Sequence, residues 1–452
     1  MKPKPVIVVI GAASATFGPK VLRDVIHHPA LEGCTLRFVD IHEEHLDIFT
    51  RLAKRINEGL EHPVKIESDT DRRPMLEGAD YVLVSVDVER IETWRQDFEV
   101  PVEEGIRQVT GELGGPGGLF HSLRQIPVHL EIGRDIAEIC PDAIVMVESN
   151  PLNRICLAME RYTDCGQILG LCHGVEITQN FIGKLLGMET EAMVATAAGV
   201  NHFHWILDLR RRDTGEDLYP LLREKLASVD LEELGHWSRW EMSRKLLDVY
   251  GYMPSCGDEH IGEYLPYAWE YCGLEGPGFE ARAEGQEELW EYYGRLAESE
   301  GPLTPHTGDI GGEFEEEKLL WFFEPRSWVD TLAFPIINSI YTNEFIRMPA
   351  VNMVNRGAIN NLPDDVFVEG PAGVDSSGVR LLSIGDLPKP LAAFCRRDID
   401  LMEMTVEAAV RGDRSLVLQA MLLDPVVDSV AAAERIIDRM MKTQAEFLPQ
   451  FA

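Results

Sequence analysis

The first third of the chain alternates short apolar runs with stretches of helical periodicity, and this alternation limits the choice of fold. The run Val6–Ile10 is apolar throughout, and similar runs occupy residues 79–86 and 143–147. Strands that are apolar on both faces occur in parallel sheets with helices on both sides. We predict strands at residues 6–10, 35–40, 79–86, 143–147 and 168–172, and helices at 19–28 and 43–60. The sequence therefore predicts an α/β fold that begins with a Rossmann-type, doubly wound parallel sheet.

The pattern changes in the second half of the chain. Residues 200–209 alternate like a half-buried strand, and residues 231–250 have a helical spacing that ends at Gly251. We expect the acidic, Gly- and Pro-rich residues 273–312 to form surface helix and loop, and residues 425–447 to form an amphipathic helix. We therefore predict a Rossmann-like domain over residues 1–198 and a mixed α/β (α+β) domain over residues 199–452.

The charge of the chain argues against some classes of partner. Its 452 residues include 42 basic and 76 acidic side chains, which gives a formal net charge of −34. Such a charge repels phosphate backbones and anionic lipids, so we expect neither nucleic acid nor membrane partners. No apolar run approaches the roughly 20 residues of a membrane span, and the first run is typical of a strand, not of a signal peptide. Eight scattered cysteines without a Cys-x-x-Cys motif indicate reduced thiols, so we expect a cytoplasmic protein.

The turn after the first strand has the small residues that a dinucleotide-binding turn needs. Gly11, Ala13 and Ser14 let the backbone approach a pyrophosphate at a helix N-terminus. Ala13 stands where the second Gly of such turns usually lies, so the turn alone fits an ordinary βα connection equally well. Asp40, at the end of the second strand, supplies a carboxylate for the adenosine ribose and disfavours the 2′-phosphate of NADP. Together, turn and acid predict that the first domain binds NAD.

Three polar segments follow predicted strands, at residues 148–153, 170–175 and 199–205. Ligands of open parallel sheets bind at the carboxyl ends of the strands, so the first two segments are expected beside the nicotinamide. Cys172 and His202 are suitable donors for one divalent transition metal, although a lone Cys or His is more often a core residue. His204 is an alternative to His202, because residues two apart on a strand face the same side.

These segments resemble those of glycoside hydrolase family 4, the NAD- and metal-dependent glycosidases, over nearly the whole chain. The resemblance rests on the Gly-x-Ala-Ser turn, Ser-Asn-Pro at residues 149–151, Cys-His-Gly-Val at 172–175, Gly-Val-Asn-His at 199–202 and the Asn-rich stretch 351–363. It implies that Cys172 and His202 bind the metal, usually Mn²⁺. It also implies that Asn150, beside the cofactor, and His173, as part of the catalytic set, contact the sugar. The family is an exception to the usual two-carboxylate scheme of glycosidases.

The resemblance further implies a redox route to hydrolysis. Family members oxidise the C3 hydroxyl by hydride transfer to NAD, remove the C2 proton, eliminate the C1 leaving group, add water and reduce C3 again. This route needs a base at C2 and an acid at the leaving oxygen. We expect Asp258 to be the base, with Tyr264 and His260 as alternatives. We expect Glu112, in the Gly-rich segment 111–118, to be the acid on a closing loop, although a flexible lid with a solvated acid is the alternative.

The residue after the metal-binding Cys bears on the substrate. Family members that act on 6-phosphosugars carry Asp or Asn there, so His173 argues for unphosphorylated alpha-glycosides. We expect an alpha-glucoside or an alpha-hexuronide, with an alpha-galactoside or an alpha-galacturonide as the alternative. Arg347 or Arg356 would be available for a uronic acid, although Arg on a surface is the commoner case.

Two other functions are possible from the sequence, and we also expect an oligomer. A simple NAD-dependent dehydrogenase would need no Cys172–His202 pair, and a non-catalytic NAD-binding sensor would need no catalytic set. We expect a homodimer or a homotetramer whose second domain contributes to assembly, with the apolar residues 334–346 either at the subunit interface or in the core.

Overall fold

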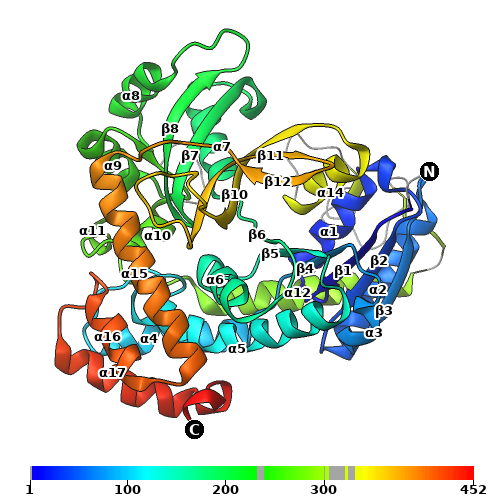
Figure 1. The fold of residues 1–452 in the computed structure, drawn as a ribbon, viewed down its shortest axis with the longest axis horizontal. Helices are drawn as coiled ribbons and strands as arrows, with labels where there is room; N and C mark the ends of the chain where they lie inside the picture. Colours follow the sequence, from blue (N-terminus) through cyan, green and yellow to red (C-terminus); the bar gives the residue numbers. More distant parts are fainter. Residues whose placement is uncertain (1–2, 232–238, 300, 305–320, 324–330) are drawn as a thin grey trace.

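The computed structural model describes residues 3–231, 239–299, 301–304, 321–323 and 331–452. These residues form one mixed sheet of 12 strands with helices packed on it (Figure 1). One half of the sheet is parallel and the other is antiparallel. The two halves meet in the middle of the molecule, and the polar segments of the sequence gather at this junction.

The parallel half contains the strands of the N-terminal part of the chain. Its strands are β1 (Val6–Ile10), β2 (Thr35–Val39), β3 (Lys65–Asp69), β4 (Tyr81–Val84), β5 (Ile144–Val147) and β6 (Ile168–Gly170). Their order is β3-β2-β1-β4-β5-β6, and each neighbouring pair is parallel. This is the strand order of dinucleotide-binding folds, so the predicted Rossmann-type α/β fold is confirmed. Sequence patterning misses β3 because this edge strand is largely exposed and has no apolar run.

Both faces of the parallel half are buried, which explains its continuous apolar strands. Val8, Val82 and Val145 pack on one face, and Ile7, Leu83 and Met146 pack on the other. The first face is covered by α3 (Arg72–Leu76), α4 (Arg90–Glu103), α5 (Gly115–Ile139) and α6 (Leu152–Tyr162). The second is covered by α1 (Phe17–Ile26), α2 (Glu43–Glu58), α12 (Phe279–Glu298) and α14 (Ala333–Thr342). The helices predicted at residues 19–28 and 43–60 are confirmed as α1 and α2.

The antiparallel half continues the sheet from β6. Its strands are β7 (Met193–Val200), β8 (Phe203–Arg211), β9 (Met253–Pro254), β10 (Ile346–Val354), β11 (Phe367–Asp375) and β12 (Gly378–Leu381). The order is β6-β10-β11-β7-β8-β9, with β12 paired to β11, and Asn352 of β10 lies opposite Gly170 of β6. Because the sheet is continuous and β7 begins at Met193, the limit between residues 198 and 199 stays a prediction.

A hairpin replaces the single strand expected at residues 200–209. β7 ends at Val200, β8 begins at Phe203, and Asn201 and His202 form the turn between them. The expectation was wrong because Val200, Phe203 and Trp205 are all buried, so the apolar pattern continues through the turn. As a result His202 lies at the end of the hairpin and not on a strand face.

The remaining helices lie around the antiparallel half or, near the C-terminus of the chain, against α4, α5 and α6 (Figure 1). They are α7 (Gly174–Leu186), α8 (Tyr219–Ser228), α9 (Glu241–Tyr250), α10 (Asp258–Ile261), α11 (Trp269–Cys272), α15 (Lys389–Arg411), α16 (Arg414–Leu423) and α17 (Val430–Thr443). α9 confirms the described end of the helix expected at 231–250, and residues 232–238 lie outside the described part of the chain. α17 confirms the C-terminal amphipathic helix, and α12 confirms the helix expected within residues 273–312, of which 300 and 305–312 lie outside the description.

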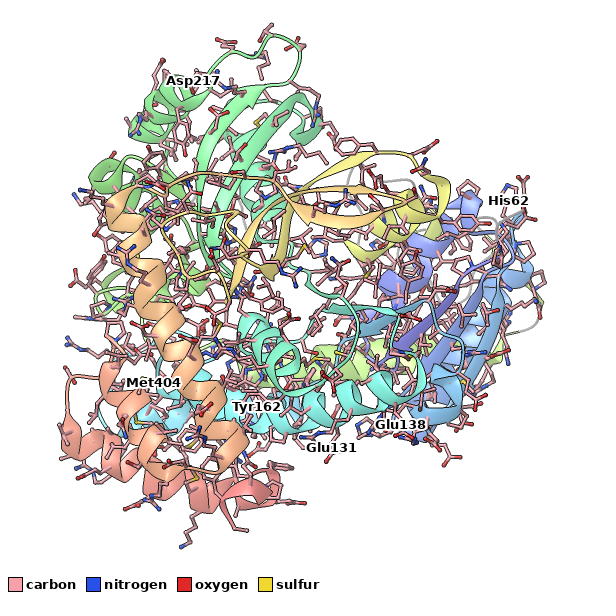
Figure 2. All side chains as sticks on the ribbon, in the orientation of Figure 1. His62, Glu131, Glu138, Tyr162, Asp217 and Met404 are labelled. Atoms are coloured by element: carbon pink, nitrogen blue, oxygen red, sulfur yellow. The ribbon has the colours of Figure 1, made fainter. Side chains whose placement is uncertain are left out.

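The apolar residues 334–346 are mostly core. Phe334, Ile336 and Ile337 of α14 are completely buried against the second face of the sheet, so the core alternative is confirmed for this helix. Acidic side chains lie at the periphery, as Glu131, Glu138 and Asp217 do in Figure 2. Of the helices in the described residues, none has the length and apolar character to cross a membrane.

Candidate active site at the carboxyl edge of the parallel sheet

Three potential metal ligands meet where the two halves of the sheet join. Cys172 follows β6, His202 forms the β7–β8 turn, and Cys256 follows β9. The Cys172 Sγ to His202 Nε2 distance is 3.0 Å, and one donor atom from each of the three residues lies within 4.8 Å of the other two. We call these residues the cysteine–histidine cluster. Sequence reasoning pairs Cys172 with His202 but misses Cys256, because a single Cys beside a Gly carries no local signal.

Two glycines let the backbone pack closely beside the cysteine–histidine cluster. A Cβ on Gly174 would lie 2.8 Å from the Cys256 Sγ, and a Cβ on Gly199 would lie 2.7 Å from the His204 Cα. Both positions therefore require glycine. His202 has a φ of +59°, a left-handed conformation that is uncommon for a residue with a side chain and is found at functional sites.

Charge in the cluster suits a divalent cation. The pKa of the Cys172 thiol lies well below its usual range, because the Cys256 thiol donates a hydrogen bond to its sulfur and His202 lies beside it, which outweighs burial. Burial would lower the pKa of His202, but the Cys172 thiolate raises it to about 9. A thiolate and an imidazole at this distance are fitting donors for a transition metal, which would replace the imidazolium proton.

His204 occupies a different environment from the cluster. It is fully buried, and its Nδ1 lies 3.3 Å from an Oε of Glu369 on β11. Burial lowers the pKa of His204 to about 4 and raises the pKa of Glu369 to about 8. Glu369 also accepts a hydrogen bond from the Asn201 amide at 3.0 Å, so it supports the turn that carries His202. Sequence reasoning missed Glu369, since a lone acid in an apolar strand shows no pattern.

Glu112 lies at the site in an ion pair. Its Oε1 accepts hydrogen bonds from Arg90 at 2.7 Å and from the Asn150 amide at 3.1 Å. Burial opposes the ionisation of Glu112, but Arg90, followed by His260 and His121, holds its pKa below the usual range. The structure thus brings Glu112 and Asn150 together, with Glu112 as a carboxylate. An acid role for Glu112 would require it to take up a proton beside Arg90.

The Gly-rich segment around Glu112 is part of the core. Residues 111–118 are all buried and lead into the N-terminus of α5. The carboxylate of Glu263 accepts hydrogen bonds from the amides of Glu112 and Leu113 at 2.7 Å and of Gly114 at 3.2 Å. The alternative of a flexible lid with a solvated acid was wrong, because these buried backbone amides need acceptors and have one in Glu263, whereas closure of the loop stays a prediction. Glu263 was missed since its partners lie about 150 residues away.

His173 and Asn150 lie in the segments that follow the neighbouring strands β6 and β5. His173 begins α7, and its Nδ1 lies 2.8 Å from an Oε of Glu176. Burial would lower the pKa of His173, but Glu176 raises it to about 9. Because Nδ1 is engaged, Nε2 is the nitrogen left to meet a ligand. Glu148, which follows β5 and lies two residues before Asn150, has its pKa raised to about 7 by burial.

The predicted cofactor turn lies at the carboxyl end of β1, between β2 and β4. Gly11 has a φ of +87°, and a Cβ on it would lie 2.1 Å from the Ser85 carbonyl oxygen. The Ala13 amide donates to the Asp40 carboxylate at 2.9 Å, and the Ser14 hydroxyl accepts from the Phe17 amide at 3.1 Å at the start of α1. The turn therefore has the compact geometry that a pyrophosphate needs at a helix N-terminus. Binding of NAD by Gly11, Ala13, Ser14 and Asp40 stays a prediction.

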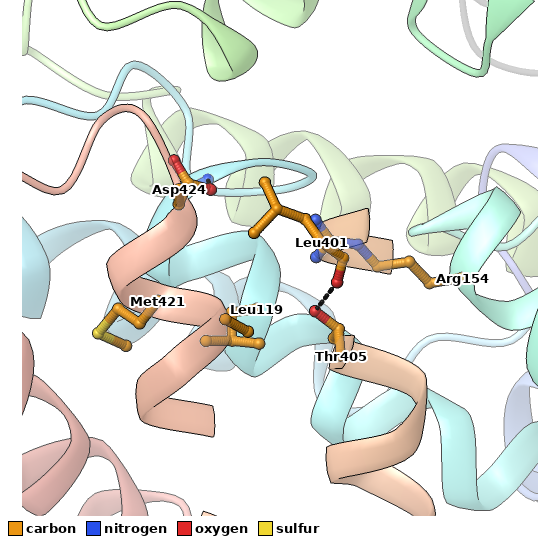
Figure 3. A pocket seen from close by; sticks show the side chains of 8 residues that line it. Leu119, Arg154, Leu401, Thr405, Met421 and Asp424 are labelled. Atoms are coloured by element: carbon orange, nitrogen blue, oxygen red, sulfur yellow. Dashed lines mark hydrogen bonds between the residues drawn. The ribbon is translucent and has the colours of Figure 1, made fainter. Parts of the chain in front are cut away.

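A small pocket beside the start of α5 is structural. It lies between α5, α15 and α16, lined by residues that include Leu119, Arg154 and Asp424 (Figure 3). The Arg154 guanidinium donates to the Gly118 carbonyl and the Ser122 hydroxyl, and the Asp424 carboxylate accepts from the Gly115 amide. These contacts fix the start of α5, which follows the segment that carries Glu112.

Comparison with known proteins identifies the family. The model of the family 4 glycosyl hydrolases matches residues 6–188, and the model of their C-terminal domain matches residues 197–427. The chain belongs to family 4 of the glycosyl hydrolases. It is 31% identical to an alpha-glucosidase of Erwinia rhapontici over 98% of both chains. It is also 31% identical to an alpha-galactosidase of Bacillus subtilis, over 98% of this chain and 99% of that one.

Solved structures agree with the fold of this family 4 protein. A 6-phospho-alpha-glucosidase from gut microorganisms, solved in complex with NAD and Mn²⁺, has a TM-score of 0.82, with 19% identity over the whole of both chains. The fold class expected from sequence is therefore confirmed across both halves of the chain.

Asp258, the expected base, contacts the start of α9 in this family 4 site. Its carboxylate is completely buried and accepts hydrogen bonds from the Met242 and Ser243 amides at 2.8 Å and from the Ser243 hydroxyl at 2.6 Å. Burial raises its pKa to about 6, but both oxygens serve as the N-terminal cap of α9. A base must reach a substrate proton, and both Asp258 oxygens are occupied in this geometry, so the structure favours another base and the role of Asp258 stays a prediction.

The two alternatives to Asp258 differ in access. The His260 ring lies 4.5 Å from the His202 ring, between centroids, and its side chain is 25% exposed. Tyr264 is buried, stacks on Phe203 and has its hydroxyl 3.4 Å from the Asn201 carbonyl oxygen. Burial raises the pKa of Tyr264 well above its usual value. His260 is therefore the better placed of the two to accept a proton beside the cysteine–histidine cluster.

Neither arginine considered for a uronic acid lies at the site. Arg347 is exposed at the start of β10, and its guanidinium donates to the Ala195 carbonyl and the Thr196 hydroxyl. Arg356 is 80% exposed and lies 3.8 Å from Glu160. Arg347 lies five positions before Asn352, the β10 residue that meets β6, so the structure does not bring it to the cysteine–histidine cluster and its contact with a sugar stays a prediction. At about 3.3 Å per residue, five positions span roughly 16 Å.

Proposed function

We propose that this protein is an alpha-glycosidase that uses NAD and a divalent metal ion to hydrolyse unphosphorylated sugars through transient oxidation of C3. The observation that carries the proposal is the 3.0 Å approach of Cys172 Sγ to His202 Nε2 at the carboxyl edge of a Rossmann-type sheet. Relatives named alpha-glucosidase and alpha-galactosidase cover nearly the whole chain, which supports the same class of substrate.

Two groups of residues would hold the cofactors. Cys172 and His202 would bind the metal, and the turn of Gly11, Ala13 and Ser14 with Asp40 would bind the dinucleotide. When bound, the metal supplies Lewis acidity to sugar oxygens and NAD accepts and returns a hydride. The fit of the metal rests on the donor chemistry of a half-buried thiolate and a buried imidazole.

The side chains around these groups would orient the sugar. Asn150 donates to Glu112 through Nδ2, which leaves its amide oxygen to accept from a sugar hydroxyl. His173, with Nδ1 held by Glu176, presents Nε2 to a sugar oxygen. Glu112 would position Asn150, and in the predicted acid role it would give a proton to the leaving oxygen. His260 would accept the C2 proton.

A neutral hexoside suits the charges of this site better than a uronide does. Two cations lie at the site, and each is already paired: Arg90 with Asp87 at 3.0 Å and Glu112 at 2.7 Å, and His173 with Glu176 at 2.8 Å. A uronic acid carboxylate would have to compete with these acids. We therefore propose alpha-glucosides or alpha-galactosides ahead of alpha-glucuronides and alpha-galacturonides.

A panel of chromogenic substrates tests the proposed function. The p-nitrophenyl alpha-glucoside, alpha-galactoside, alpha-glucuronide and alpha-galacturonide are each incubated with and without NAD and Mn²⁺. We expect p-nitrophenol release from a neutral hexoside only when NAD and the metal are both present, with no net NADH. Accumulation of NADH without p-nitrophenol would indicate a simple dehydrogenase, and turnover without NAD would refute the redox route.

Matched variants separate the two candidates for the base. Asp258→Asn keeps one cap oxygen and is expected to lose about 1–2 kcal/mol of unfolding free energy, because α9 loses part of its N-terminal cap. Its kcat should stay within about threefold of wild type. His260→Gln should lower kcat by at least about 100-fold at nearly unchanged stability, as for loss of a general base. A kcat that falls with Asp258→Asn and survives His260→Gln would reverse the assignment.

The setting of the protein is also a proposal. We propose that it works in the reducing cytoplasm, since all eight cysteines are free thiols.

We further propose that the protein is a homodimer or homotetramer. Phe345 and Leu382 are 67% and 37% exposed, and both approach Gly373 on the β10–β12 surface, so they form an apolar surface that a second subunit could cover. Light scattering coupled to gel filtration measures the mass directly.

A further inference from the structure

We propose that Cys256 is a third protein ligand of the metal, so that the centre has two thiolates and one imidazole. This inference rests on the proposed function, which requires metal binding only by Cys172 and His202. It changes the expected chemistry of the centre, because the number of sulfur ligands determines which metals bind well.

The distances in the cysteine–histidine cluster match one coordination sphere. A tetrahedral ion with metal–sulfur bonds of about 2.3 Å and metal–nitrogen bonds of about 2.0 Å has ligand–ligand edges of roughly 3.5–3.8 Å. The three donor atoms lie within 4.8 Å of one another, and the pair of Cys172 Sγ and His202 Nε2 is at 3.0 Å. Shifts of less than about 1.5 Å would therefore bring all three to one cation.

The backbone holds the Cys256 thiol at the cluster in a strained conformation. Cys256 has a φ of +96°, which costs a residue with a side chain of order 1–3 kcal/mol. Its amide donates to the Thr178 hydroxyl at 3.0 Å. The preceding Ser255 donates its amide to the His204 carbonyl and its hydroxyl to the Gly174 carbonyl, each at 3.0 Å. Contacts from α7 and β8 thus force a conformation that would otherwise relax.

The surroundings leave Cys256 directed at the other donors. Cys256 is 1% exposed, so water does not compete for the thiol. Gly174 borders its sulfur, where any Cβ would lie 2.8 Å away. Both Cys256 and His202 belong to the few residues other than glycine with positive φ among those described. Strain at two of three donors in one cluster fits a site whose geometry is set by a ligand and not by local preference.

Two thiolates and one imidazole favour a softer ion than Mn²⁺. Thiolate ligands select Zn²⁺ and similar transition metals, whereas Mn²⁺ prefers oxygen donors. A Cys₂His set with an open position is the catalytic zinc site of alcohol dehydrogenase, which also works beside NAD. We therefore expect this chain to bind Zn²⁺ and Co²⁺ more tightly than Mn²⁺, with a position left for a sugar oxygen.

The sulfur count on the wild-type full chain is the primary test. The protein is loaded with Zn²⁺ under a phosphine reductant, which keeps the neighbouring thiols from forming a disulfide, and the zinc X-ray absorption fine structure is measured. We expect two sulfur neighbours at about 2.3 Å. One sulfur neighbour would overturn the inference while leaving metal binding intact. A chain that binds neither Zn²⁺ nor Mn²⁺ would instead remove the basis of the proposed function.

A variant gives a second, independent readout. Cys256→Ser should halve the thiolate-to-Co²⁺ charge-transfer band and weaken Zn²⁺ binding by about 100-fold, since even outer-shell partners of a metal cost 10–100-fold. Mn²⁺ affinity should fall less than Zn²⁺ affinity, because the serine hydroxyl is an oxygen donor of the kind that Mn²⁺ prefers. Cys165→Ser is the control, because Cys165 contacts Thr163 and lies outside the cluster. An unchanged charge-transfer band would contradict the inference, and if Cys256→Ser does not fold, the wild-type sulfur count still decides.

Discussion

Cys172→Ser is expected to lose about 1,000-fold in kcat/KM together with its dependence on added metal. The Cys172 sulfur is 3.0 Å from His202 Nε2 and would be a thiolate donor that a serine hydroxyl cannot replace at neutral pH. Lewis acidity at sugar oxygens contributes several kcal/mol to such reactions, and each 1.36 kcal/mol is a factor of ten. A loss of about 4 kcal/mol therefore corresponds to the expected fold-change.

The measurement compares kcat/KM across a Mn²⁺ and Zn²⁺ titration in wild type and variant. Cys165→Ser serves as the matched control, because it replaces a half-buried thiol that the cluster does not include. Melting temperatures establish that both variants are folded. Metal-dependent turnover of Cys172→Ser at the wild-type level would remove Cys172 from the site and leave the proposed function without its main support.

Glu263→Ala should destabilise the protein by about 4 kcal/mol. The Glu263 carboxylate accepts from three buried amides at the start of α5, those of Glu112, Leu113 and Gly114. A buried amide without an acceptor costs about 1–3 kcal/mol, and water that enters the space left by the side chain recovers part of the sum. The same loss loosens the backbone of Glu112, so activity should fall as well.

Denaturant unfolding and amide hydrogen exchange measure this effect. We expect the amides of residues 112–114 to exchange much faster in Glu263→Ala, with Glu263→Gln in between because it keeps one acceptor oxygen. Glu287→Ala on the exposed face of α12 is the matched control and should be neutral within about 0.5 kcal/mol. Slow exchange at 112–114 in Glu263→Ala would mean that other acceptors hold this segment.

Sequence patterning predicts those parts of the fold where burial is the same along a whole strand. Val6–Ile10 and residues 143–147 are apolar because helices cover both faces of the sheet, and both were found as strands. The pattern fails at β3, which is exposed, and at the β7–β8 turn, where burial continues on both sides. A local hydrophobic pattern reports which residues are buried. It therefore misses a strand that is exposed and a turn between two buried strands.

The predicted site residues also fall into two groups, those recognised from a characteristic segment and those chosen for their polarity alone. Resemblance to family 4 points to Cys172 and His202 because each lies in a short, recognisable segment, and the structure brings their donor atoms together. Asp258 and Arg347 look equally polar in the sequence, yet one caps α9 and the other binds the edge of β7. Polarity alone does not distinguish a catalytic group from a cap or a surface contact, because the difference lies in the partners.

By itself, the sequence determined the Rossmann-type sheet, the family and the segments that form the site. The tertiary structure decided that Cys256 joins Cys172 and His202, that Glu263 holds the segment of Glu112, and that His260 has better access than Asp258. The physical reason is the separation along the chain over which each interaction acts. Hydrophobic periodicity and turn chemistry act between near neighbours, whereas coordination, ion pairing and helix capping join groups that only the folded chain brings within a few ångströms.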